Sequence, residues 1–155
     1  MKIITLTGFK QSGKTKLAQL WARNENVSYL YPYTTASKRP EDFIYLSRDK
    51  IDEKKKYENV LCTTIIKGES YVYFESQLKN DFNIIIVDDY ALSEIVENYD
   101  GRVIKIWIDS SKAESSERSG HFHTRDYYDY TYDMELDDPD EFLEQLAFDV
   151  EMVQH

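Results

Sequence analysis

The chain has few of the features that mark secreted or membrane proteins. Cys62 is the single cysteine among 155 residues, so a disulfide within the chain is excluded. No N-terminal apolar segment has the length of a signal peptide or of a membrane span. We therefore expect a soluble, cytoplasmic protein with no membrane partner. At this length we also expect one domain over residues 1–155.

Positive charge is missing from the C-terminal part of the chain. Residues 126–155 hold eleven Asp and Glu and no Lys or Arg, whereas the first 125 residues hold 19 basic against 18 acidic residues. A surface for DNA or RNA needs clustered cations, so this distribution argues against a nucleic-acid partner. A small phosphate ligand is still compatible, because a few cations create a local positive pocket whatever the net charge. We interpret the acidic stretch as a solvated helix face.

Glycine is scarce, yet two of the five glycines fall in one phosphate-binding motif. The pattern G-x-x-x-x-G-K-[ST] is matched at every fixed position, and we predict that the whole stretch binds ATP: Gly8, Phe9, Lys10, Gln11, Ser12, Gly13, Lys14 and Thr15. In such a P-loop, backbone N–H groups and the lysine hold phosphates, and the hydroxyl binds Mg²⁺. A β-rich run at residues 2–7 precedes the motif and apolar residues at helical spacing follow it. This context favours a phosphate site at a helix N-terminus over a chance glycine turn.

Predicted strands and helices alternate along the rest of the chain. We expect strands at residues 27–31, 59–66, 71–74, 83–89, 103–108 and 130–132, and helices at 91–99 and after Asp138. Residues 47–56 are predicted to be a surface helix or loop. The strands at 59–66 and 71–74 form a hairpin that extends from the main sheet as a small subdomain. The alternation predicts a three-layer α/β P-loop fold with a mostly parallel sheet.

Two carboxylates, Asp88 and Asp89, end the clearest apolar strand. Ligand groups in α/β folds lie at the carboxyl ends of strands, and in P-loop proteins an acid there orients Mg²⁺ through water. We therefore predict both as magnesium acids. The alternative is that Asp89 caps the following helix.

Two polar segments carry candidate phosphate-binding cations. Residues 33–42 are predicted to be a loop near the P-loop, for which a solvated turn is the alternative. Residues 110–126 are predicted to be a flap. The principal cations of the two segments are Lys38, Arg39, Arg118 and Arg125.

Histidines and tyrosines near the flap admit other interpretations. His121 and His123 lie two apart, but no third ligand is near, so we interpret them as polar groups and not as a metal site. The tyrosines of residues 127–132 are able to stack on a base, although we favour packing of the final strand.

In this order of parts the chain resembles a nucleoside monophosphate kinase, most closely the guanylate kinase family. The likeness rests on the P-loop, on the two threonines and cations of residues 34–39, on the glycine and tyrosines of residues 68–73, and on residues 128–138 before the final helix. It spans nearly the whole chain, and the P-loop is its sharply specific part. It implies a monophosphate-binding subdomain at about residues 32–75 and a lid at about residues 110–126.

The resemblance implies ATP-dependent phosphorylation of a nucleoside or deoxynucleoside monophosphate, with ATP and Mg²⁺ as cofactors. Nucleotides are the expected partners, and the protein is expected to be a monomer or homodimer. The implied catalytic residues are Lys14, Arg118 and Arg125. The implied substrate residues are Thr35, Lys38, Arg39, Tyr71, Tyr73 and Asp88, and the metal residues are Thr15, Asp88 and Asp89.

Two positions depart from the family pattern. Ala36 stands where the first of the paired arginines would be, with Lys38 as a neighbouring substitute. Cys62 falls, by ungapped count back from Gly68, where the family's acidic residue reads the guanine edge. Discrimination of this kind depends on a polar partner that the wrong base leaves unpaired. A relaxed or different base preference, as in the deoxynucleoside monophosphate kinases that phages carry, is therefore expected.

Two other functions fit the same motif. One is a P-loop kinase for another small acceptor, in which Asp88 would act as base at a hydroxyl group. The other is a guanylate kinase-like binding module without catalysis. The intact pair Lys14 and Thr15 argues against the module, which has no need of both.

Overall fold

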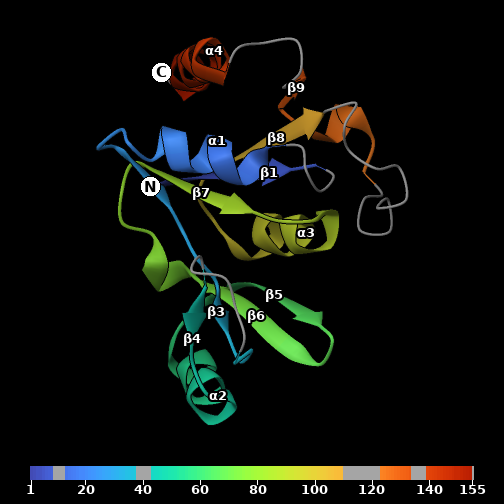
Figure 1. Cartoon of the computed structure of the whole chain (residues 1–155). Helices are drawn as coiled ribbons and strands as arrows, with labels where there is room; N and C mark the ends of the chain where they lie inside the picture. The colour runs from blue at the N-terminus through green and yellow to red at the C-terminus, as the bar shows by residue number, and fades with distance from the viewer. Residues whose placement is uncertain (9–12, 38–42, 110–122, 134–138, 155) are drawn as a thin grey trace.

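A five-stranded parallel sheet forms the centre of the computed structural model, which describes residues 1–8, 13–37, 43–109, 123–133 and 139–154 (Figure 1). In spatial order its strands are β2 (Val27–Tyr29), β7 (Phe82–Ile86), β1 (Lys2–Thr7), β8 (Val103–Asp109) and β9 (Tyr130–Asp133). Every neighbouring pair is parallel, and parallel strands need crossover connections. Helices α1 (Lys14–Trp21), α3 (Asp89–Asn98) and α4 (Pro139–Gln154) follow β1, β7 and β9. The predicted α/β fold with a mostly parallel sheet is confirmed.

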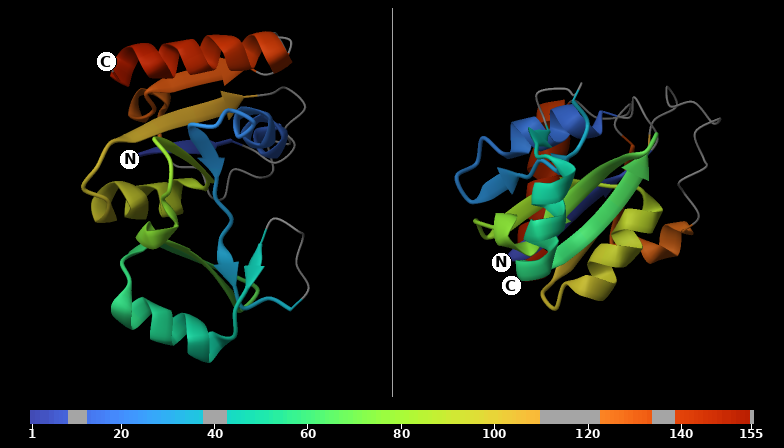
Figure 2. Two further views of the ribbon diagram at one scale, coloured as in Figure 1. Left: turned by 90° about the vertical axis from the view of Figure 1, so that its left-hand side faces the viewer. Right: turned by 90° about the horizontal axis from the view of Figure 1, so that it is seen from below.

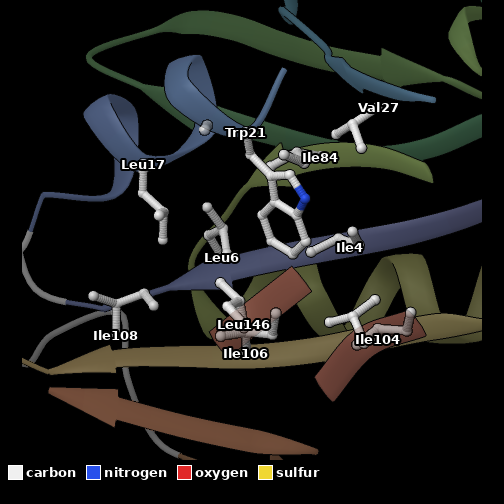
Figure 3. Close-up of a cluster of buried hydrophobic side chains, with 12 residues drawn as sticks. Ile4, Leu6, Leu17, Trp21, Val27, Ile84, Ile104, Ile106, Ile108 and Leu146 are labelled. Atoms are coloured by element: carbon white, nitrogen blue, oxygen red, sulfur yellow. The ribbon is translucent and has the colours of Figure 1, made fainter. Parts of the chain in front are cut away.

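Alternation along β1 divides the core between the two faces of this sheet. Ile4 and Leu6 share one face, where they pack with Trp21 of α1 and Leu146 of α4 (Figure 3). Ile3 belongs to the cluster on the α3 side. Neighbouring strand residues point to opposite faces, so each face acquires its own apolar cluster. Helices on both sides complete three layers (Figure 2).

A second sheet, which we call the hairpin sheet, has the strand order β4-β3-β6-β5. Its strands are β3 (Tyr33–Thr34), β4 (Ile44–Tyr45), β5 (Val60–Ile66) and β6 (Glu69–Phe74). The antiparallel pair β5–β6 is joined at Lys67 and Gly68, whose φ angles of 51° and 79° suit a tight hairpin turn. The predicted hairpin is confirmed, and it lies beside the parallel sheet as a separate unit (Figures 1 and 2).

Helix α2 (Arg48–Tyr57) covers the far side of the hairpin sheet (Figure 2). Ser47 caps it by accepting from the backbone N–H of Lys50, and three lysines in the last turn suit the helix dipole. Its buried residue, Ile51, packs with Val72 and Phe74 of β6. Of the two structures predicted for residues 47–56, the helix is therefore the one that forms.

Several predicted boundaries differ from the structure, and two of the differences matter for the site. Sequence analysis predicts a loop over residues 33–42, but Tyr33 and Thr34 form β3 between β4 and β6. A strand of two residues is too short to show the alternation of apolar and polar side chains. Its pairing depends on β6, which lies much further along the chain. The strand predicted at residues 83–89 ends at Ile86, because Asp88 caps α3. Among the described residues, no helix is long and apolar enough to span a membrane.

Candidate active site

The phosphate-binding motif joins β1 to α1 at the carboxyl edge of the parallel sheet. Gly8 is buried directly after β1, and Gly13 is the N-cap of α1 with a φ angle of 90°. Glycine adopts this left-handed conformation without steric cost. In the described part of the chain, α1 has no side-chain cap and no acid in its first turn, so its N–H groups suit an anion. Phe9, Lys10, Gln11 and Ser12 lie outside the described residues.

Lys14 begins α1 and reaches back over the motif. Its Nζ donates to the Gly8 carbonyl at 2.6 Å, and both residues line a cleft of about 490 Å³. Thr15, the next residue, is exposed on the first turn. The P-loop lysine and the first glycine of the motif therefore stand together on the wall of the cleft.

The cleft runs from the P-loop to the inner face of the hairpin sheet. The structure brings five predicted site residues to it, namely Gly8, Lys14, Tyr71, Tyr73 and Asp88. It adds Phe43, Thr64 and Ile66, which were not predicted, and Cys62, which the sequence singled out only as a departure from the family pattern. Thr64 was open to prediction, since it shares a face of β5 with Cys62 two residues away. Phe43 carries no such local signal.

Aromatic and neutral side chains make up the hairpin end of the cleft. The rings of Phe43 and Tyr71 meet edge-on with centroids 5.4 Å apart, and Tyr73 is buried beside them. Burial raises the pKa of the Cys62 thiol to about 12, and the carboxylates of Glu94 and Asp88 add to the rise. The thiol is therefore neutral, and this position of the cleft carries no anion.

The two adjacent acids of α3 face different surroundings. Asp88 lines the cleft and caps the helix by accepting from the backbone N–H of Ala91 at 2.8 Å. Asp89 is fully buried, and its oxygens accept from the backbone N–H of His123 at 2.8 Å and from the Tyr128 hydroxyl. The cap predicted for Asp89 thus belongs to Asp88. The role of Asp89 as a magnesium acid stays a prediction, and the structure shows its carboxylate bonded to protein donors inside the fold.

Thr35 serves the hairpin sheet itself. Its hydroxyl donates to Glu69 at 2.5 Å and accepts from the backbone N–H of Ser70 at 3.0 Å. These bonds tie β3 to β6 and engage the hydroxyl that sequence analysis assigned to substrate. The other predicted phosphate-binding cations of this unit, Lys38 and Arg39, lie outside the described residues.

Arg125 lies in the short 3₁₀ helix η3 (Arg125–Tyr127). Its guanidinium is largely exposed and donates to Asp109, the last residue of β8, at 2.8 Å. Since β8 runs parallel to β1, Asp109 and the P-loop belong to the same edge of the sheet. Arg118 lies outside the described residues.

The remaining histidine and tyrosine predictions have mixed outcomes. The His123 ring bonds to Ser93 and stacks on Tyr127, and no group of three or more metal-ligating side chains occurs among the residues described. His121 lies outside that part of the chain. The hydroxyls of Tyr130 and Tyr132 both donate to Asp149 of α4, so these tyrosines pack the final strand, as favoured from the sequence.

Comparison with known proteins gives one kind of match. No protein-family model matches the chain, and no curated protein matches it. Among solved structures, guanylate kinase from Anaplasma phagocytophilum aligns with a TM-score of 0.67 and 17% sequence identity, over 98% of this chain and 85% of that chain. At this identity the likeness is one of fold. The chain therefore has a guanylate kinase-like P-loop fold.

Proposed function

We propose that the protein is a nucleoside monophosphate kinase, which transfers a phosphoryl group from ATP to a nucleoside or deoxynucleoside monophosphate. One observation carries the proposal: a single cleft joins the P-loop residues Gly8 and Lys14 to the tyrosines of the hairpin sheet. Such a cleft accommodates two phosphorylated molecules whose phosphates meet near Lys14. The fold shared with a guanylate kinase supports the same arrangement.

The donor end is suited to the phosphates of ATP. The N–H groups of the first turn of α1 and the ammonium of Lys14 supply positive character where β- and γ-phosphates would lie. Phosphoryl transfer needs little covalent chemistry from the protein, so positioning and charge neutralisation do most of the work. In the proposal Lys14, Arg118 and Arg125 neutralise the transferring group.

The oxygen groups near the P-loop fit Mg²⁺. Thr15 presents an exposed hydroxyl on the first turn, and Asp88 presents a carboxylate to the cleft. Mg²⁺ prefers oxygen ligands, keeps several waters and is completed by substrate phosphates, so one hydroxyl and one acid are a suitable protein share. When bound, the ion would neutralise charge on the phosphates. Asp88 would orient its waters while it also caps α3.

The acceptor end predicts relaxed base selection. Cys62 is a neutral thiol, and the walls around it are the aromatic rings of Phe43 and Tyr71 and the hydroxyl-bearing Thr64. Such contacts bind the flat face of a nucleobase and discriminate little between the hydrogen-bonding edges of different bases. Few buried polar groups of the protein are left unpaired when a different base is bound. We propose that more than one base is accepted, as in phage-type deoxynucleoside monophosphate kinases. Lys38, Arg39 and the Tyr71 hydroxyl would hold the acceptor phosphate.

The test is ADP formation from ATP across a panel of ribo- and deoxynucleoside monophosphates. We expect turnover with several bases, and Lys14→Ala should lose most of it. Lys16→Ala is the matched control, since Lys16 is exposed two residues further along α1 and is not among the described residues that line the cleft. The proposal would be refuted if the wild-type protein formed no ADP with any monophosphate of the panel. Full activity in Lys14→Ala would refute it as well.

A kinase for a different small acceptor is the second candidate, because Asp88 places a carboxylate in the cleft. A hydroxyl acceptor needs such a base, whereas a phosphate acceptor is already an anionic nucleophile. Turnover with a sugar or cofactor precursor, and with no monophosphate, would favour this candidate. Nucleotide binding without any ADP formation would favour a binding module.

A further inference from the structure

Asp89 is a fully buried carboxylate in a place where the helix does not need it. Asp88 already caps α3, so Asp89 adds no cap. Burying a carboxylate is costly unless donors compensate it. Two donors to Asp89 come from outside α3, namely the backbone N–H of His123 and the hydroxyl of Tyr128. The cost is thus offset by contacts that join separate parts of the chain.

These contacts fix η3 to the start of α3. His123 and Tyr128 flank η3 on its two sides, and both bond to Asp89. The ring of His123 adds a hydrogen bond to Ser93, one turn further along α3, at 3.0 Å. It also stacks on Tyr127 with ring centroids 3.7 Å apart. The element that carries Arg125 is therefore tied to the helix that carries Asp88.

Tyr128 also packs on β8, the strand that pairs with the strand leading into the P-loop. Burial raises the pKa of its phenol, as does the bond to Asp89, so the hydroxyl stays neutral and donates. The Tyr128 ring also packs against that of Trp107 in β8 with centroids 5.4 Å apart, and Trp107 pairs with Thr7 of β1. Thr7 is the last residue of β1 and directly precedes Gly8. Tyr128 thus contacts the start of α3 through its hydroxyl and the parallel sheet, next to the end of β1, through its ring.

We propose that Asp89 and Tyr128 are positioning residues, whose hydrogen bond holds Asp88, Gly8 and Arg125 in one fixed arrangement for phosphoryl transfer. The inference rests on the proposed function. Neither Asp89 nor Tyr128 is proposed to contact the substrate. A similar pair, Tyr132 and Asp149, lies between β9 and α4, away from the residues that line the cleft, and there the bond serves packing alone.

That second pair supplies the matched control. Tyr128→Phe and Tyr132→Phe each remove one hydroxyl from a tyrosine–aspartate bond between elements. If Asp89 and Tyr128 position the cleft, Tyr128→Phe should lower kcat by roughly tenfold to a hundredfold while the KM for ATP changes less than about twofold. Tyr132→Phe should keep kcat within about twofold even if its thermal midpoint falls equally. Equal kcat in the two variants would overturn the proposal.

Asp89 variants sharpen the test. In Asp89→Asn the amide oxygen can still accept from His123 and the amide N–H₂ can donate to the Tyr128 oxygen, so this variant should retain more kcat than Asp89→Ala. Because the two residues act through one bond, Asp89→Asn combined with Tyr128→Phe should be no slower than the slower single variant. Fully multiplicative losses would contradict a shared role.

Amide hydrogen exchange separates this proposal from the proposed function. Exchange over residues 123–128 should be faster in Tyr128→Phe than in wild type, and unchanged in Tyr132→Phe. If the wild type phosphorylates no monophosphate, the proposed function fails. Amide exchange in Tyr128→Phe then still shows whether the bond between Asp89 and Tyr128 holds residues 123–128 in place. If the wild type is active and exchange in Tyr128→Phe matches that of the wild type, the positioning proposal fails alone.

Discussion

The parallel sheet and the hairpin sheet are buried to different extents. Helices cover both faces of the parallel sheet, and its central strands hold fully buried isoleucines and leucines. The hairpin sheet has α2 on one face and the cleft at the other, with a cluster of three buried residues, Ile51, Val72 and Phe74. At its tip, Ile65 and Ile66 are 69% and 51% exposed. The hairpin sheet therefore has much less buried apolar surface to hold it.

The hairpin sheet is nevertheless firmly held at its base. Leu61 and Cys62 are buried in the same cluster as Leu92 of α3, and Asn98 of that helix donates to the Leu61 carbonyl at 3.0 Å. The unit is thus anchored beside α3 and open at its tip. Regions with few buried contacts open at the lowest free-energy cost. The parallel sheet therefore holds most of the buried apolar core, and the loosely packed end of the hairpin sheet borders the cleft.

The largest expected effect compares one isoleucine from each region. Ile84→Ala removes a fully buried side chain from the core of the parallel sheet and should lower the free energy of unfolding by about 3–5 kcal/mol. Ile51→Ala removes an equally buried side chain from the three-residue cluster and should cost at most about 2 kcal/mol, because that small cluster relaxes or opens locally. Urea unfolding followed by circular dichroism measures both. Equal losses would contradict the comparison.

The next largest effect is the pH dependence of stability caused by Cys62, which is buried where the hairpin sheet packs beside α3. Folding raises the pKa of Cys62 from 9.0 to about 12, so above pH 9 the unfolded chain releases a proton that the folded chain keeps. The stabilising contribution is complete below pH 9 and falls as the pH rises toward 12, by about 1.4 kcal/mol per pH unit. Cys62→Ala should therefore lose less stability between pH 9 and 10.5 than the wild type. If the stability of the two proteins changed with pH in the same way, the Cys62 thiol would not be shielded from water in the folded protein.

A smaller effect is expected at the open end. Tyr71→Phe removes a hydroxyl from the cleft and keeps the ring that meets Phe43. The lost hydrogen bond to the acceptor is worth about 1 kcal/mol, so the acceptor KM should rise about fivefold with little change in stability. Tyr57→Phe is the control, since Tyr57 is 82% exposed on α2. A Tyr71→Phe protein with unchanged acceptor KM would place the acceptor elsewhere.

What the sequence predicts well is local. The motif at residues 8–15 has fixed spacing, and the buried strands β1 and β7 are short apolar runs bounded by polar residues, so each is legible from a few neighbours. Predictions that need distant partners fail. Nothing near Asp89 reveals that His123 and Tyr128 bond to it, and nothing near Thr35 reveals Glu69. Adjacent acids look alike in sequence, and the partner across the fold decides which one faces the cleft.

The smallest effect tests whether the hairpin unit responds by itself. Ser47 caps α2 with a long hydrogen bond of 3.4 Å, so Ser47→Ala should cost about 0.5 kcal/mol, at the low end for an N-cap. Because Ile51 of α2 packs with Val72 and Phe74 of the hairpin sheet, that loss should appear as faster amide exchange within Arg48–Tyr57. The urea midpoint of the parallel sheet and the kcat should stay unchanged. A midpoint shift as large as that of Ile84→Ala would mean that the two sheets unfold as one unit, and that the hairpin sheet does not open locally.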